Sequence, residues 1–207
     1  MIDDTQRERS HRIANFLFEV GTMRKLMRMH RQTLLTDDNS DNIASHSYRV
    51  TIIGWVLAYM EKVDPYTVVM MCLLHDMGEI RSNDHNWVHK KYITVHEDEI
   101  IEDQLGQLPF PDLKAFAMEY EKRESRESLV AKDADMLDQV LLLREYEWQG
   151  NKEAHIWLHG KGKNYTETYN QQTANLKTPS AKGLATAIVE QDPSEWWNNL
   201  WTSTNRK

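Results

Sequence analysis

A histidine, an aspartate and a glutamate follow directly after an apolar run of the sequence. The run begins at Val68, and the polar residues are His75, Asp76 and Glu79. A continuous apolar segment of this kind predicts a helix that is buried on most of its faces. Helical spacing places His75 and Glu79 on the same face as Val68. We therefore expect the three polar side chains at the inner end of a core helix, where an unpaired charge is costly and either changes its pKa or acquires a partner.

A buried histidine–aspartate pair has two interpretations. Most such pairs are hydrogen-bonded core residues rather than metal ligands. Adjacent residues of a helix point about 100° apart, so His75 and Asp76 reach a common atom only if it lies in the angle between them. A metal ion fits that position. Further ligands at core-facing positions elsewhere in the chain would favour the metal.

Two further candidates occupy such positions. His46 belongs to a predicted helix face that is otherwise apolar, formed by His46, Val50, Ile53, Leu57 and Met60. Asp135 flanks the apolar face of a later predicted helix, whereas Asp133, an acid in an early turn of that helix, is predicted to be a surface residue. His46, His75, Asp76 and Asp135 thus come from three predicted helices, and no local motif explains their order.

The composition excludes several classes of protein. A chain of 207 residues is long enough for one domain with a full core, and 40% hydrophobic with 28% charged residues is typical of soluble globular proteins. The formal net charge of −7 argues against general nucleic-acid or anionic-membrane binding. A single cysteine, Cys72, leaves no disulfide framework. Because no apolar stretch approaches the length of a membrane helix and the N-terminus is not signal-like, we expect a cytoplasmic protein with no membrane contact.

The pattern of caps and apolar spacing predicts an all-α fold in a single domain, residues 1–207, with a core of about 28–197. Asp64 and Pro65 predict the start of the helix that ends in His75 and Asp76. A long first helix is expected to run into the basic cluster Arg28–Arg31, and residues 152–164 are expected to form a surface loop. The other expected helices begin near Ile43, Thr94, Asp112 and Val130, with two more around 181–189 and 196–201.

In its order H…HD…D, the set of four candidate ligands resembles the HD-domain metal-dependent phosphohydrolases. The segments around the set are similar to that family as well, namely Ile43–Val50, Leu74–Glu79 and Lys132–Leu137. The tail Asp192–Trp197 is similar to that of the small 5′-deoxynucleotidase-like branch. The resemblance implies a helical bundle with the metal site at its centre, where His46, His75, Asp76 and Asp135 bind one divalent ion.

The resemblance also implies roles for the surrounding residues. Two imidazoles and two carboxylates suit a divalent Mn, Co, Ni, Fe, Mg or Zn ion, which would activate a water and polarise the phosphorus centre. Glu79 and Asp84 correspond to residues that position and activate the water. Arg31, with Arg28 as the substitute, corresponds to the arginine that contacts the phosphate. The polar loop Thr33–Asn42 departs most from the family pattern and is expected to border the base and sugar.

The expected activity is that of a 5′-nucleotidase, which releases phosphate from a small-molecule nucleotide, a (deoxy)ribonucleoside 5′-monophosphate. A nucleoside triphosphate triphosphohydrolase and a catalytically silent nucleotide-binding scaffold remain as alternatives. The C-terminal tryptophans Trp196, Trp197 and Trp201 either pack back onto their own chain or, as the resemblance suggests, contribute to a homodimer.

Overall fold

The computed structural model describes residues 3–160, 171–198 and 200, in which helices are joined by turns and no strand occurs. The all-α prediction is confirmed. The chain forms two compact units, residues 1–135 and 136–207, with the boundary inside one long helix. Each unit is described by itself, and the expectation of a single domain stays a prediction.

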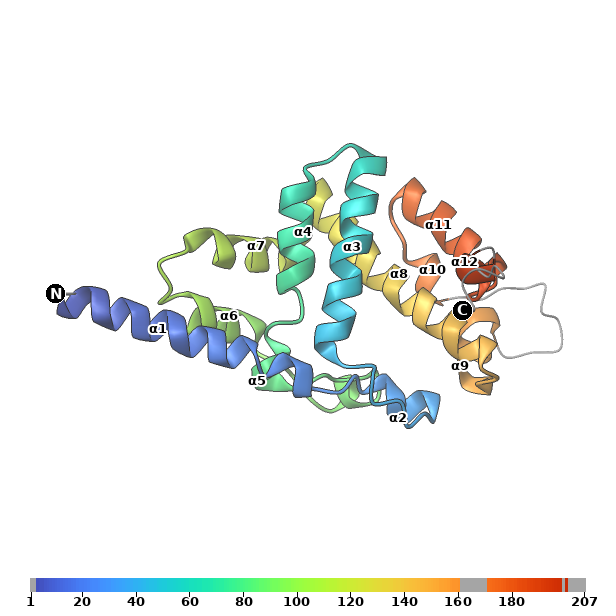
Figure 1. Ribbon diagram of the computed structural model, residues 1–207, viewed down its shortest axis with the longest axis horizontal. Coiled ribbons are helices and arrows are strands. Elements are labelled where there is room, and N and C mark those ends of the chain that lie inside the picture. The colour runs from blue at the N-terminus through green and yellow to red at the C-terminus, as the bar shows by residue number, and fades with distance from the viewer. Residues whose placement is uncertain (1–2, 161–170, 199, 201–207) are drawn as a thin grey trace. The chain divides into compact units, whose positions relative to one another are not determined.

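The first unit is built on the antiparallel pair α3 (Ile43–Glu61) and α4 (Pro65–Leu74), which lie side by side in Figure 1. Asn42 caps α3 by accepting from the backbone N–H of Ser45. Asp64 caps α4 by accepting from Tyr66 and Thr67, which confirms the start predicted for that helix. In the turn between them Lys62 takes a left-handed conformation, with φ 57°.

The two helices approach closely at Gly54. A β-carbon added at Gly54 would lie 2.5 Å from the sulfur of Cys72 and 3.2 Å from Cγ1 of Val68 on α4. All three residues are buried, so only glycine permits this separation of the helix axes. This contact fixes the distance between α3, which carries His46, and α4, whose C-cap is His75.

Two more helices and the first half of another complete the packing of this unit. These are α6 (Glu97–Leu105), α7 (Pro111–Lys122) and the start of α8 (Arg126–Trp148), and α7 packs against both α4 and α6. One buried cluster joins the end of α4 to α6 and α7, and it is formed by Leu74, Met77, Ile101, Leu105 and Ala117. The shorter elements are η1 (Met23–Lys25), α2 (His30–Leu34), α5 (Glu79–Ser82) and η2 (His89–Lys91).

The prediction of a first helix that runs into the basic cluster Arg28–Arg31 is wrong about where the helix ends. α1 (Asp4–Val20) is capped by Asp3 and stops before Gly21, a weak helix former, where Thr22 Oγ1 donates to the carbonyl of Glu19. The chain then turns, and Met27 pairs in an isolated antiparallel bridge with Asn42. Arg28 therefore leaves from an extended segment rather than from a helix C-terminus.

The helix that contains the apolar run also ends earlier than expected. α4 stops at Leu74. The backbone hydrogen bonds that follow join residues three apart, from Met77 N to Leu74 O and from Glu79 N to Asp76 O. These tighter turns change the direction of the chain, so Glu79 opens the separate helix α5. Beyond α5, Asn83 has a positive φ of 70°, which turns the chain toward Asp84.

Two further expectations fail on α8 and beyond it. Asp133 is buried, with 1% exposure, in a stretch of α8 in which no residue from 128 to 147 is exposed. Residues 152–159 form a helix, α9 (Lys152–His159), instead of a surface loop, because Asn151 caps it through the N–H of Ala154. The remainder of that expected loop, 161–164, lies outside the described residues.

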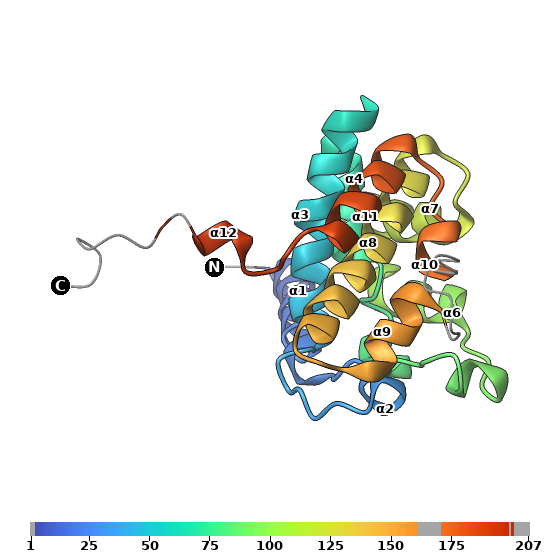
Figure 2. The same ribbon diagram turned by 90° about the vertical axis from the view of Figure 1, so that its right-hand side faces the viewer.

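The second unit continues with three helices, α10 (Gln171–Ala174), α11 (Pro179–Glu190) and α12 (Glu195–Asn198). Figure 2 shows α9 and the end of α8 side by side. The side chain of Trp196 is 72% exposed and contacts Trp197 edge to face. Trp201 lies outside the described residues.

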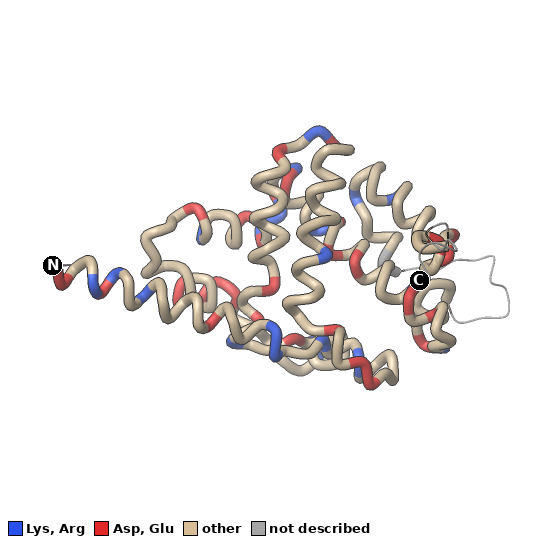
Figure 3. The backbone as a smooth tube through the Cα atoms, in the orientation of Figure 1, with Lys and Arg blue, Asp and Glu red and all other residues tan. Residues whose placement is uncertain are grey.

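Residues of both charge signs occur along α1, and the charged residues of α6 are acidic (Figure 3). No helix in the described ranges has the length and apolar character needed to cross a bilayer.

The contact at Gly54 gives a stability prediction. We expect Gly54→Ala to lower the free energy of unfolding by about 1–3 kcal/mol, because the new methyl group overpacks the contact with Cys72. Combining it with Cys72→Ala should recover part of the loss, which a double-mutant cycle of urea melts would measure. The matched control is Gly183→Ala on α11, where an added β-carbon meets no atom within 4 Å and should be neutral or stabilising. Equal effects at both glycines would contradict the close approach.

Candidate metal centre

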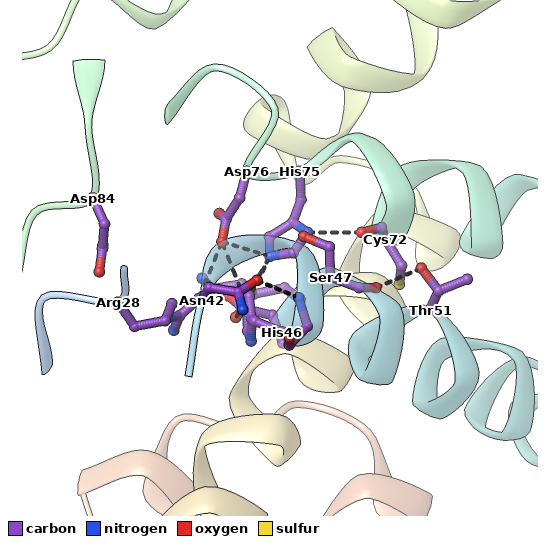
Figure 4. Close-up of polar contacts among 12 residues, drawn as sticks. Arg28, Asn42, His46, Ser47, Thr51, Cys72, His75, Asp76 and Asp84 are labelled. Carbon is purple, nitrogen blue, oxygen red and sulfur yellow. Dashed lines mark hydrogen bonds and ion pairs between the residues drawn. The ribbon is translucent and has the colours of Figure 1, made fainter. Parts of the chain in front are cut away.

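The side chains of His46 on α3, of His75 and Asp76 in the turn after α4, and of Asp135 on α8 lie close together in the first unit. The Nε2 atoms of His46 and His75 lie 3.1 Å apart. Oδ2 of Asp76 lies 3.3 Å from the first nitrogen and 3.2 Å from the second. Oδ1 of Asp135 lies 3.2 Å from Nε2 of His46 and 3.8 Å from that of His75. Figure 4 shows His46, His75 and Asp76 pointing toward one another.

The separations of 3.1 to 3.3 Å suit the ligands of one divalent ion. Ligand atoms about 2.1 Å from an ion lie about 3.0–3.4 Å from each other when the angle at the ion is between square and tetrahedral. Nδ1 of His75 is 2.7 Å from the carbonyl oxygen of Cys72, to which it donates. A neutral imidazole that donates from Nδ1 presents a lone pair at Nε2, so the backbone of α4 turns His75 into a ligand. His46, His75 and Asp135 form a group able to hold a metal ion, and the carboxylate of Asp76 lies beside them.

Asp135 is held by two residues that the sequence did not point to. Its Oδ2 accepts from Lys132 Nζ at 2.6 Å and from the hydroxyl of Tyr120 at 3.3 Å, which leaves Oδ1 to face the histidines. The pKa of Asp135 is well below its usual value: burial raises it, but Lys132 and the two histidines lower it more. Lys132 could have been found from its spacing of three residues on the same helix. Tyr120 had no signal beyond its apolar helix face.

Arg28 is the buried cation of this site. Its Nη1 donates to Asp76 Oδ2 at 3.2 Å, while its Nε is buried without a hydrogen-bond partner. Burial lowers the pKa of Arg28, but the carboxylates around it, above all Asp76 and Asp84, raise the pKa overall. Arg28 therefore stays charged, with one N–H still available.

The backbone around Arg28 is fixed by the neighbouring loops. Arg28 N donates to Asp41 O at 3.1 Å, and Met29 N donates to Oδ2 of Asp84. The buried amide of Asn86 donates to the carbonyl of Met29 at 2.9 Å. Asp84 thus reaches the site region through a backbone contact next to Arg28, and it adds negative charge there.

Arg31 lies in a different environment. Its guanidinium donates to Oδ1 of Asn39 at 3.2 Å and lies 3.9 Å from Asp37. Of the two arginines proposed for the phosphate, the structure brings Arg28 into contact with the four-residue cluster.

Glu79 carries a buried carboxyl oxygen, Oε2, with no hydrogen-bond partner. Burial, followed by the negative charges of Asp76 and Asp84, raises the pKa of Glu79 to about 10. The side chain is thus a carboxylic acid at neutral pH, with an O–H to donate. Because α5 is separate from α4, this position depends on the tight turns after Leu74 and not on one continuous helix face. The ligand and catalytic roles of all these residues stay predictions.

Comparisons with known proteins agree with this architecture. The family model described as "HD domain" matches residues 23–177. A 5′-deoxynucleotidase of Dictyostelium discoideum is 28% identical over 123 residues, which are 53% of this chain and 64% of that protein. A ribonuclease Y of Borreliella burgdorferi is 37% identical over 59 residues, 28% of this chain and 12% of that protein. The chain therefore matches less than two thirds of the length of either relative.

A solved structure is similar over nearly all of the chain. It is titled as a predicted metal-dependent phosphohydrolase of Magnetospirillum magnetotacticum, is 26% identical, and has a TM-score of 0.64 with coverage of 92% of this chain and 95% of that one. The family match includes the candidate ligands from His46 to Asp135 and crosses the boundary between the two units. The resemblance seen in the sequence is confirmed, and the chain belongs to the HD-domain family of metal-dependent phosphohydrolases.

Proposed function

We propose that this protein is a 5′-nucleotidase that releases orthophosphate from (deoxy)ribonucleoside 5′-monophosphates. The observation that carries the proposal is the cluster of His46, His75, Asp76 and Asp135 with one buried arginine, Arg28, in contact with it. A single buried guanidinium suits one phosphate group, whereas a triphosphate needs several cations. The similarity to a deoxynucleotidase supports the same substrate class.

His46, His75, Asp76 and Asp135 would hold the divalent ion, through two nitrogen and two oxygen atoms. When bound, such an ion lowers the pKa of a water and withdraws charge from a phosphate. The remaining functions fall to residues of the chain. Arg28, anchored on Asp76 by one N–H, directs its remaining donors to phosphate oxygens. Asp84, fixed by the backbone of Met29, orients the attacking water.

Glu79 supplies the proton. Its carboxyl group, with a pKa raised to about 10, can donate to the 5′-oxygen as the ester bond breaks. Protonation of that oxygen lets the nucleoside leave as a neutral alcohol. The same side chain, once ionised, can accept a proton from water and return to its resting form.

A phosphate-release screen with Mn²⁺, Co²⁺, Ni²⁺, Mg²⁺ and Zn²⁺ tests the proposal. Nucleoside 5′-monophosphates should yield orthophosphate. Release of tripolyphosphate from nucleoside triphosphates would instead identify the protein as a triphosphohydrolase. Cleavage of an RNA oligonucleotide would identify it as a ribonuclease, the activity named for the Borreliella relative. No product with any substrate would favour a silent nucleotide-binding scaffold.

The two candidate phosphate arginines can be separated by the same substitution at each. We expect Arg28→Met to lower kcat/KM for a monophosphate by about 10–100-fold, the value of one or two charge-assisted hydrogen bonds. Arg31→Met, which removes a contact with Asn39 instead, should change kcat/KM by less than about threefold. Steady-state kinetics with one nucleotide and one metal measure both. The reverse order would assign the phosphate to Arg31.

Glu79 and Asp76 are expected to separate turnover from metal binding. Glu79→Gln keeps the shape of the side chain but removes the transferable proton, so kcat should fall by about 10²–10⁴-fold with metal content unchanged. Asp76→Ala removes a ligand oxygen and should lose metal and activity together. Metal analysis after dialysis, alongside kcat, distinguishes the two. Equal metal loss in both variants would make Glu79 a ligand.

We further propose that the protein forms a homodimer. Apolar and aromatic side chains are exposed in a helical stripe on α3, formed by Tyr48, Ile52, Trp55 and Tyr59, and the side chain of Trp196 is exposed on α12. Stripes of this kind are typical of protein interfaces.

We expect a dimeric mass by light scattering at micromolar concentration. Trp55→Glu should shift it to a monomer if α3 forms the contact, and Trp196→Glu should do so if the C-terminal helix does. Phe18→Glu on α1, where the side chain is 78% exposed, serves as the control. A monomeric mass for the unmodified chain would reject the dimer.

A further inference from the structure

A second group of ligand-type side chains lies in the second unit, at the junction of α8 and α9. Oε1 of Glu147 is 2.6 Å from Nδ1 of His155 and 2.8 Å from Nε2 of His159. The three ligand atoms all lie within 4.8 Å of one another. The two imidazoles are one turn apart on α9, with ring centroids 4.7 Å apart. The group shares no residue with the four-residue cluster of the first unit.

The backbone holds these side chains in register. Gly150, with φ 90°, forms the turn between the helices, and Asn151 N donates to Tyr146 O at 2.9 Å. Gly is needed there because a positive φ strains other residues. Ala154 and Leu158, the residues that precede the two histidines, are fully buried and anchor α9. The histidines are therefore presented by a packed helix and not by a loop.

The carboxylate of Glu147 is oriented from its other side. Arg144 Nη1 donates to Oε2 at 3.1 Å, and Arg144 Nε donates to the carbonyl of Gln191 at 3.2 Å. Oε2 is thus occupied, and Oε1 is directed at the imidazoles. Burial raises the pKa of Glu147, but the hydrogen bonds from His155 and His159, the His159 ring and Arg144 lower it overall, so the group stays ionised at neutral pH.

We propose that Glu147, His155 and His159 form a second divalent metal site, separate from the phosphohydrolase centre. In the metal-free arrangement each imidazole donates its N–H to the same oxygen. If each ring moves its proton to its other nitrogen, Nδ1 of His155 and Nε2 of His159 present lone pairs, and one cation takes the place of the two shared protons. No oxidant or reductant is needed, and no net proton is released.

The ligand set indicates the class of metal. Two imidazole nitrogens and one carboxylate oxygen favour Zn²⁺, Co²⁺, Ni²⁺ or Cu²⁺ over Mg²⁺ and Ca²⁺, which prefer oxygen alone. The side chain of His155 is 38% exposed, so the ion can enter from solvent and complete its coordination with water. Since the ligands come from the end of α8 and from α9, bound metal would stabilise the packing of these two helix segments against each other.

Metal stoichiometry after equilibrium dialysis against Zn²⁺ tests the site on the full-length chain. The unmodified protein should retain two ions per chain. Glu147→Gln and His155→Asn, both close in size to the native side chains, should each retain one. His96→Asn is the matched control and should retain two, because in the described part of the chain Nδ1 of His96 has a single carboxylate contact, Glu99 at 3.9 Å. Variants of Glu147 and His155 that bind as much Zn²⁺ as the parent would overturn the proposal.

The Zn²⁺-dependent change in Tm provides a second test, which still distinguishes the outcomes if a substitution lowers the stability of the fold. Asp76→Ala, which disables the first site, should still show a Zn²⁺-dependent rise in Tm of at least about 3 °C at saturating metal. The double variant Asp76→Ala/Glu147→Gln should show none, whatever its Tm without metal. A Zn²⁺-dependent rise that survives in the double variant would mean that these three residues are only a hydrogen-bonded cluster. Loss of the rise already in Asp76→Ala would mean the same.

Discussion

The first unit depends on the balance of charge around the two facing imidazoles. The carboxylates of Asp76, Asp84 and Asp135 are buried or half-buried there, with the cations of Arg28 and Lys132 against them. With neutral imidazoles and a protonated Glu79, the group retains one net negative charge. Isolated buried charges are costly, and removing one partner of a buried pair leaves the other uncompensated. Under the proposed function, a divalent ion and a phosphate would add charges of opposite sign to this group.

The ends of two helices position the charged and ligand-type side chains of this group. α1 ends at Val20, which frees the segment before Arg28 to extend and pair with Asn42. α4 ends at Leu74, so that His75 can turn its Nδ1 to the carbonyl of Cys72. If α1 or α4 continued as a helix, successive side chains would point in directions spread around the helix axis and would not converge. Gly54 then sets how near α3 brings His46.

Much of this was predictable from the sequence, for reasons that differ between residues. His46 stood on an apolar helix face, and Asp64–Pro65 marked a helix start; both signals are local, and the structure follows them. The end of α1 before Gly21 and the tight turns after Leu74 come from local hydrogen bonds that the apolar periodicity does not encode. The preference of acids for the first turns of a helix predicts a surface position for Asp133, but burial along α8 overrides that preference. α9 was missed because its cap, Asn151, follows a glycine and precedes only two buried residues, Ala154 and Leu158.

Arg31 lies on α2, next to a polar loop whose residues it contacts. Thr33–Asn42 departs most from the family pattern, and Arg31 contacts Asn39 and Asp37 within it. The end of that loop, Asn42, caps α3 through Ser45, accepts from the backbone N–H of His46 and pairs with Met27 beside Arg28. A change in the loop therefore reaches both a candidate ligand and the candidate phosphate arginine through one residue. Arg31 thus contacts this loop rather than the four-residue cluster, and Asn42 links the end of the loop to His46 and to the segment before Arg28.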